Sequence, residues 1–80
     1  MNIYSIDFHA KCPTNGIRIC YRLRIEVKFV IQVEVIVDVI NTITDGFHEA
    51  IADLLFAKFG GRQTLTADHH SVNIQTIREP

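Results

Sequence analysis

The sequence predicts a single domain of the α+β class, a three-stranded antiparallel sheet of order β-β-α-β with one long amphipathic helix packed on one face. Two patterns carry this prediction. Apolar and polar residues alternate without a break from Ile17 to Phe29, which is the period of a half-buried strand. From Val33 to Phe59 the apolar residues keep the 3.6-residue period of a helix.

The composition limits the classes of protein to which the chain can belong. Of its 80 residues, 48% are hydrophobic and 21% charged, so it suits one domain, residues 1–80, and is too apolar to be disordered. The 8 Lys and Arg balance 9 Asp and Glu, so an electrostatic function must depend on where the charges lie. The N-terminus lacks signal-peptide features and no uncharged apolar run reaches the roughly 18 residues that span a bilayer, so we expect a cytoplasmic protein. In that compartment Cys12 and Cys20 are expected to be reduced.

Three strands are expected. The alternating segment Met1–Ala10 forms the first, and Pro13, Asn15 and Gly16 supply the turn into the second, which covers residues 17–29. Their parities predict a hairpin with Ala10 opposite Ile17, which places both apolar sets on one face. After a polar loop over 62–68, residues 70–78 form the last strand, beside the first.

The helix is expected to run for about 27 residues, or about 40 Å, from Val33 to Phe59. Gly46 predicts a kink near its middle, and Gly60 and Gly61 end it. An alternative interpretation makes residues 31–42 a third strand and begins the helix at Asp45.

Acidic residues line the outer face of the expected helix. This stripe contains no Lys or Arg, whereas solvated helices usually mix the two signs. It predicts a binding surface for a basic protein, such as a nucleic-acid-binding complex, and the alternative is a solubilising surface. Phe56, expected to be exposed beside the stripe, would anchor the partner. The predicted partner-binding residues are Glu34, Asp38, Asp45, Glu49, Asp53 and Phe56.

Basic residues line the outward face of the second strand and predict an alternative, nucleic-acid-binding surface. They are Arg18, Arg22, Arg24 and Lys28. No aromatic residues alternate with them, as they do in proteins that stack single-stranded bases. The other interpretation is a sheet face covered by solvent or by a second copy of the chain, and a homodimer is also expected, through this face or the edge of the second strand.

Catalytic and metal motifs are not found. His48 and Glu49 begin an H-E-x-x-H pattern, but Ala52 stands where the second histidine belongs. There is no glycine-rich phosphate loop. We therefore expect no enzyme activity, no metal and no cofactor.

Taken together, these features predict a non-enzymatic inhibitor that acts by occupying a protein surface. In its size, its acidic face and its lack of motifs the chain resembles the small inhibitors that phages and mobile elements use against host defences, such as anti-CRISPR proteins. This resemblance implies that the acidic residues block a basic groove meant for nucleic acid. A small nucleic-acid-binding module is the alternative.

Overall fold

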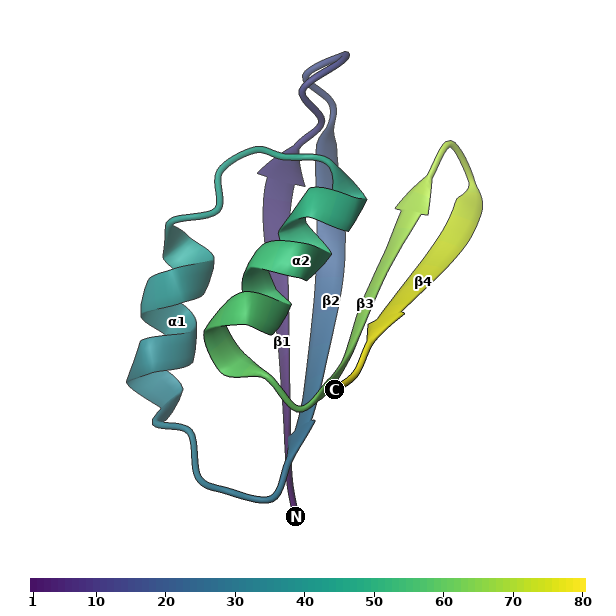
Figure 1. Cartoon of the computed structure of the whole chain (residues 1–80). Helices are drawn as coiled ribbons and strands as arrows, with labels where there is room; N and C mark the ends of the chain where they lie inside the picture. Colours follow the sequence, from purple (N-terminus) through teal and green to yellow (C-terminus); the bar gives the residue numbers. More distant parts are fainter.

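The computed structural model describes all residues from Met1 to Pro80. Strands β1 (Asn2–Lys11) and β2 (Arg18–Val27) come first, helices α1 (Val33–Asn41) and α2 (His48–Phe59) follow, and strands β3 (Arg62–His69) and β4 (Val72–Arg78) end the chain. The strands form one antiparallel sheet in the order β1-β2-β3-β4. Both helices cover the same face of this sheet (Figure 1). The α+β class is confirmed, but the predicted three strands and single long helix are wrong.

The β1–β2 hairpin forms as expected, with its register shifted by two residues. Ala10 lies opposite Ile19, where the sequence predicts Ile17. The turn is longer than expected because Cys12 N–H donates to Ile17 O at 2.9 Å and Gly16 N–H donates to Cys12 O at 2.8 Å. A shift of two residues preserves parity, so both apolar sets still face the helices.

The predicted helix from Val33 to Phe59 is interrupted at residues 42–47. Gly46 has a φ of 147°, which residues with a side chain rarely adopt. The connecting segment also pairs with the end of β1, because Lys11 N–H donates to Thr44 O at 3.0 Å and Gly46 N–H donates to Lys11 O at 3.2 Å. These bonds replace helical ones, so the expected kink is a complete break. The alternative strand over 31–42 is also wrong, since residues 33–41 are helical.

The segment predicted to be a polar loop, residues 62–68, belongs to β3. It pairs with β2 on one side and with β4 on the other, so the last strand is not beside the first. The alternation of this strand was hard to see in the sequence because Gln63, a polar residue, occupies an inward position. Its buried amide donates to Leu55 O at 3.0 Å and to Gly60 O at 2.8 Å. A two-residue turn then joins β3 to β4 through His70 and Ser71, both with positive φ.

The core lies between the sheet and the two helices. Its largest fully buried side chains are Tyr21, Leu23, Ile25, Leu55 and Leu65. Helix α1 contributes Ile36 and Ile40, and lies beside β1 (Figure 1). Helix α2 contacts β3 and β4. Both helices face this core, but the apolar phase that suggested one helix does not continue across the break. Phe47 and Leu54 belong to that phase and are 57% and 43% exposed, so α2 turns a different face to the sheet than a continuous helix would.

The free edges of the sheet belong to β1 and β4. Strand β2 is an inner strand, paired with β1 and, over Tyr21–Glu26, with β3, so it is not the free edge that the sequence analysis expected. The helix-free face remains open. Neither helix has the length and apolar character needed to cross a membrane.

Candidate functional site

The acidic residues predicted to form one stripe are divided among α1, the connecting segment and α2. Glu34 and Asp38 are exposed on α1, and Asp45 is exposed in the connecting segment. Glu49 and Asp53 are exposed on α2. The structure therefore does not align the five carboxylates along one helix axis.

Arg78, the last residue of β4, binds both α2 carboxylates. Its Nη2 lies 2.6 Å from Glu49 Oε2, and its Nε lies 2.9 Å from Asp53 Oδ1. The hydrogen bond from Arg78 holds the pKa of Glu49 below its usual range. The charge on this part of α2 is thus compensated from a strand that the sequence analysis placed elsewhere.

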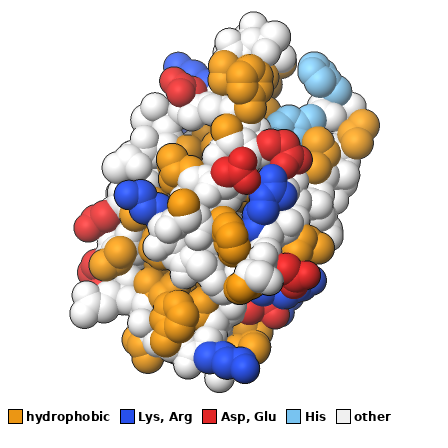
Figure 2. Space-filling model, in the orientation of Figure 1, with side chains coloured by type: hydrophobic (Ala, Val, Ile, Leu, Met, Phe, Trp, Pro, Cys, Tyr) orange, Lys and Arg blue, Asp and Glu red, His pale blue; other side chains and the backbone are white.

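A cluster of exposed apolar side chains lies where β2 leads into α1. Phe56, the predicted anchor, is half-buried. The exposed apolar residues lie elsewhere, since Phe29, Val30 and Val33 are 56%, 79% and 58% exposed. Figure 2 shows hydrophobic side chains gathered over this lower end of the molecule. We name this surface the α1 patch and define it as Tyr4, Phe29, Val30, Val33 and Val37.

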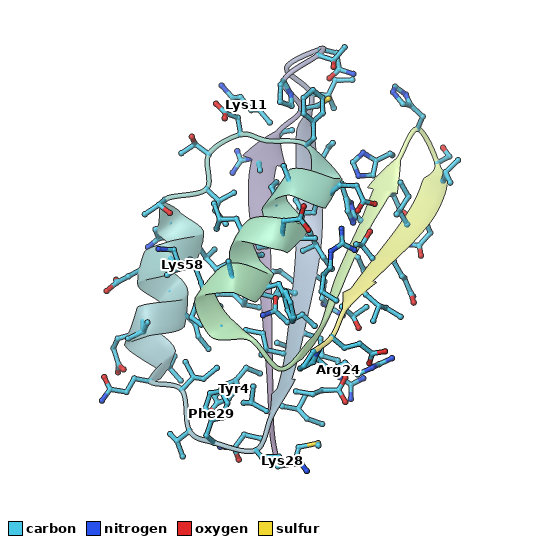
Figure 3. All side chains as sticks on the ribbon, in the orientation of Figure 1. Tyr4, Lys11, Arg24, Lys28, Phe29 and Lys58 are labelled. Atoms are coloured by element: carbon cyan, nitrogen blue, oxygen red, sulfur yellow. The ribbon has the colours of Figure 1, made fainter.

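The α1 patch is held in place by β1. Tyr4 Oη accepts a hydrogen bond from Ile31 N–H at 3.0 Å, which fixes the loop that presents Phe29 (Figure 3). Tyr4, Val33 and Val37 also line a small cavity of about 120 Å³ between β1 and α1, six of whose seven lining residues are hydrophobic. This cavity could admit an apolar side chain from a partner.

The helix-free face carries a groove of about 320 Å³, which we name the arginine groove. Arg22 and Arg24 point into it from β2, opposite Thr66 and Thr64 of β3. All four strands contribute to its lining, which consists of Ser5, Arg22, Arg24, Arg62, Thr64, Thr66, Gln75 and Ile77. Three guanidinium groups beside hydroxyl and amide groups form a set of donors suited to a phosphate or carboxylate.

Acidic neighbours partly neutralise the arginine groove. Asp7 accepts two hydrogen bonds from Arg22, at 2.7 and 2.9 Å, and the pKa of Asp7 is lowered by that contact. Glu26 lies 2.9 Å from Arg62 and 4.0 Å from Arg24. Arg24 is therefore the guanidinium with the weakest internal partner.

Two of the predicted basic residues lie outside the arginine groove. Arg18 lies opposite Lys11 in the β1–β2 register, at the far end of the sheet, and Lys28 follows the end of β2. Lys11 and Lys28 stand at opposite ends of the molecule (Figure 3). The sequence analysis missed Arg62, Thr64 and Thr66 because it assigned them to a loop, although Thr64 and Thr66 alternate with apolar residues as strand residues do.

A third concave site, the histidine pocket, has a volume of about 290 Å³ at the start of α2. His48, on α2, is buried, and its Nδ1 lies 3.0 Å from Nε2 of His69, at the end of β3. His48 Nε2 lies 3.2 Å from Leu65 O. Burial, followed by the proximity of His69, lowers the pKa of His48. The sequence contains no signal that joins residues 48 and 69, because their proximity depends on the order of the strands.

Comparison with known proteins does not assign a function to any of these three surfaces. No protein-family model, curated protein or solved structure matches the chain. Its function must therefore be argued from the three surfaces themselves. No group of three or more His, Cys, Asp or Glu residues is arranged to hold a metal ion, and both cysteines are free thiols.

Proposed function

We propose that this chain is a non-enzymatic inhibitor that acts in the cytoplasm by covering part of a partner protein with the α1 patch. The observation that carries the proposal is the exposure of Phe29, Val30 and Val33 on neighbouring segments. Contiguous exposed apolar side chains rimmed by polar ones are typical of protein-binding surfaces. The free thiols support a reducing compartment.

The charges around the α1 patch indicate the chemistry of the partner. Glu34 and Asp38 are exposed on α1, which has no basic residue, and Lys28 is exposed at the other end of the loop. The charges on α1 and the loop before it are therefore net acidic, and this side of the patch suits a partner with an apolar centre and a basic border. We propose a basic nucleic-acid-binding surface of a host defence complex as this partner, and covering that surface would inhibit the complex.

The experiment compares two substitutions on the same helix. Val33→Lys places a charge in the α1 patch, whereas Val35→Lys places one at an exposed position about 200° around the helix. Immobilised wild type and Val35→Lys should retain the same protein from the native host, and Val33→Lys should lose it. With the isolated partner, Glu34→Lys should weaken binding and reduce its dependence on salt.

Two outcomes would reject this proposal. One is equal retention by the wild type and both lysine variants. The other is a dimer of wild type, seen by light scattering at micromolar concentration, that Val33→Lys dissociates, because the patch would then be covered by a second copy of the chain.

The arginine groove favours a second candidate, the binding of a nucleic acid through its phosphates. The supporting observation is the convergence of Arg22, Arg24 and Arg62 on one groove. If this candidate is correct, Arg22→Ala with Arg24→Ala should elute from heparin or DNA at lower salt than wild type. The control, Arg18→Ala with Lys28→Ala, removes the same charge outside the groove and should elute with wild type. Equal shifts in both double variants would exclude the groove.

A further inference from the structure

The histidine pocket shares no residue with the α1 patch or the arginine groove, so it requires a separate explanation. Its walls are mainly apolar and include Ile19, Tyr21, Phe47 and Ile74. Tyr21 and the two histidine rings contact one another at tilted angles, with ring centroids 5.4 Å apart and planes at 56° for Tyr21 and His48, and 5.1 Å apart and planes at 57° for the histidines. An apolar cavity of about 150 Å³ is sufficient to hold benzene, so a pocket of about 290 Å³ can hold one or two rings.

The hydrogen bonds of the pocket fix the hydrogen positions on both imidazoles. Leu65 O can only accept, so Nε2 of His48 carries the hydrogen and donates to it at 3.2 Å. In neutral His48, Nδ1 is then an acceptor, and His69 Nε2 must donate to it across 3.0 Å. Neutral His69 is left with an acceptor at Nδ1, and this nitrogen has no partner within the protein.

The one carboxylate that lines the pocket, Glu49, already has hydrogen-bond partners within the protein. Glu49 binds Arg78 at 2.6 Å and accepts a hydrogen bond from the Thr76 hydroxyl at 3.3 Å. Both nitrogens of His48 are also occupied. The pocket therefore presents mainly apolar walls together with the unpaired acceptor His69 Nδ1, the Tyr21 hydroxyl and the free Cys12 thiol, which suits a ligand that is mostly apolar and has one donor.

We propose that the histidine pocket binds a small aromatic molecule of one or two rings whose N–H or O–H group donates to His69 Nδ1. His48 acts as a positioning residue, because its link to Leu65 O holds the His69 ring in the tautomer that accepts. The pocket contains no basic side chain besides the histidines, and its carboxylate, Glu49, is already paired with Arg78, so the ligand is neutral.

Phenol and toluene test this proposal, because they share one ring and nearly one size but only phenol donates. Binding of each is measured by titration at pH 8, where an imidazole is neutral. The key quantity is the ratio of the phenol and toluene affinities in each variant. His69→Phe keeps a ring but removes the acceptor, so this ratio should fall roughly three- to tenfold from its wild-type value. His70→Phe alters an exposed neighbour that does not line the pocket and should leave the ratio unchanged.

A second measurement does not depend on the folding of a variant. In the wild type, phenol should shift the ¹⁵N resonance of His69 Nδ1, and toluene should not. The proposal is overturned if neither probe binds at millimolar concentration, if His69→Phe keeps the wild-type ratio, or if phenol leaves that resonance in place.

Discussion

Arg78, at the end of β4, lies 2.6 Å from Glu49 in the first turn of α2. The same guanidinium reaches Asp53, one helical turn further on, at 2.9 Å. Strand β4 has only one neighbouring strand, so these ion pairs give it a second attachment, to the helix above it. Carboxylates that look free in the sequence thus help to hold an edge strand.

The Arg78 contact makes a prediction about the titration of Glu49. In Arg78→Gln the pKa of Glu49 should rise toward its usual value of 4.5, because the hydrogen bond that lowers it is lost. In the wild type, the stabilisation from this pair is present above pH 4.5 and is lost as the pH falls through the lowered pKa. A ¹³C-detected titration of the Glu49 carboxyl measures the shift. Arg18→Gln is the control, and an equal pKa in wild type and Arg78→Gln would contradict the predicted role of this contact.

His48 predicts a second pH dependence, at higher pH. Burial lowers the pKa of His48 from the usual 6.5. Between the lowered pKa of the folded chain and the usual pKa of the unfolded chain, the unfolded chain therefore binds more protons. Stability should therefore be complete above pH 6.5 and fall as the pH drops through the folded pKa. Urea unfolding at pH 7.5 and pH 5.5 measures the change. His48→Gln should reduce this pH dependence and His70→Gln should not. An identical pH profile in the His48 variant would show that another group is responsible.

The sequence was sufficient to predict the elements in which alternation or helical phase coincides with burial. The β1–β2 hairpin is one example, since Tyr21, Leu23 and Ile25 are all inward and apolar. Strand β3 was missed because Gln63 fills an inward position with a polar side chain, which becomes acceptable only when Leu55 O and Gly60 O accept its hydrogens. A pattern of hydrophobicity cannot contain that information.

The helix break and the sites were missed for a related reason. The apolar residues keep one helical phase in the sequence across residues 42–47, but the structure does not follow it, since Leu54 of that phase is 43% exposed. The break depends on hydrogen bonds to Lys11, 35 residues before Gly46. The pairing of Arg78 with Glu49 and the contact of His48 with His69 likewise require the order of the strands. The sequence analysis assigned the outward positions of β2 correctly and so named Arg22 and Arg24. It could not name Arg62, which lines the same groove from β3.

Adjacent leucines on α2 test the assignment of the core. Leu55 is completely buried, whereas Leu54 is 43% exposed. Leu55→Ala should lower the free energy of unfolding by about 2 to 5 kcal/mol, because it removes buried methyl groups and leaves a cavity. Leu54→Ala should cost about 0.5 kcal/mol or less. Denaturant unfolding of both variants compares them directly, and similar losses would mean that α2 is rotated from the orientation described.

Two glycines with similar backbone angles separate strain from crowding. Gly16 has a φ of 71° with open space around it, so Gly16→Ala should cost about 1 to 2 kcal/mol through backbone strain alone. Gly61 has a φ of 69°, but an added Cβ would overlap Val27 Cγ1 and lie 2.5 Å from Glu26 O. Gly61→Ala should therefore cost about 3 kcal/mol, since overpacking adds to a similar strain. Urea unfolding measures both costs. Because Gly61 packs where α2 returns to the sheet beside β2, equal losses in the two variants would show that this return does not approach β2 so closely.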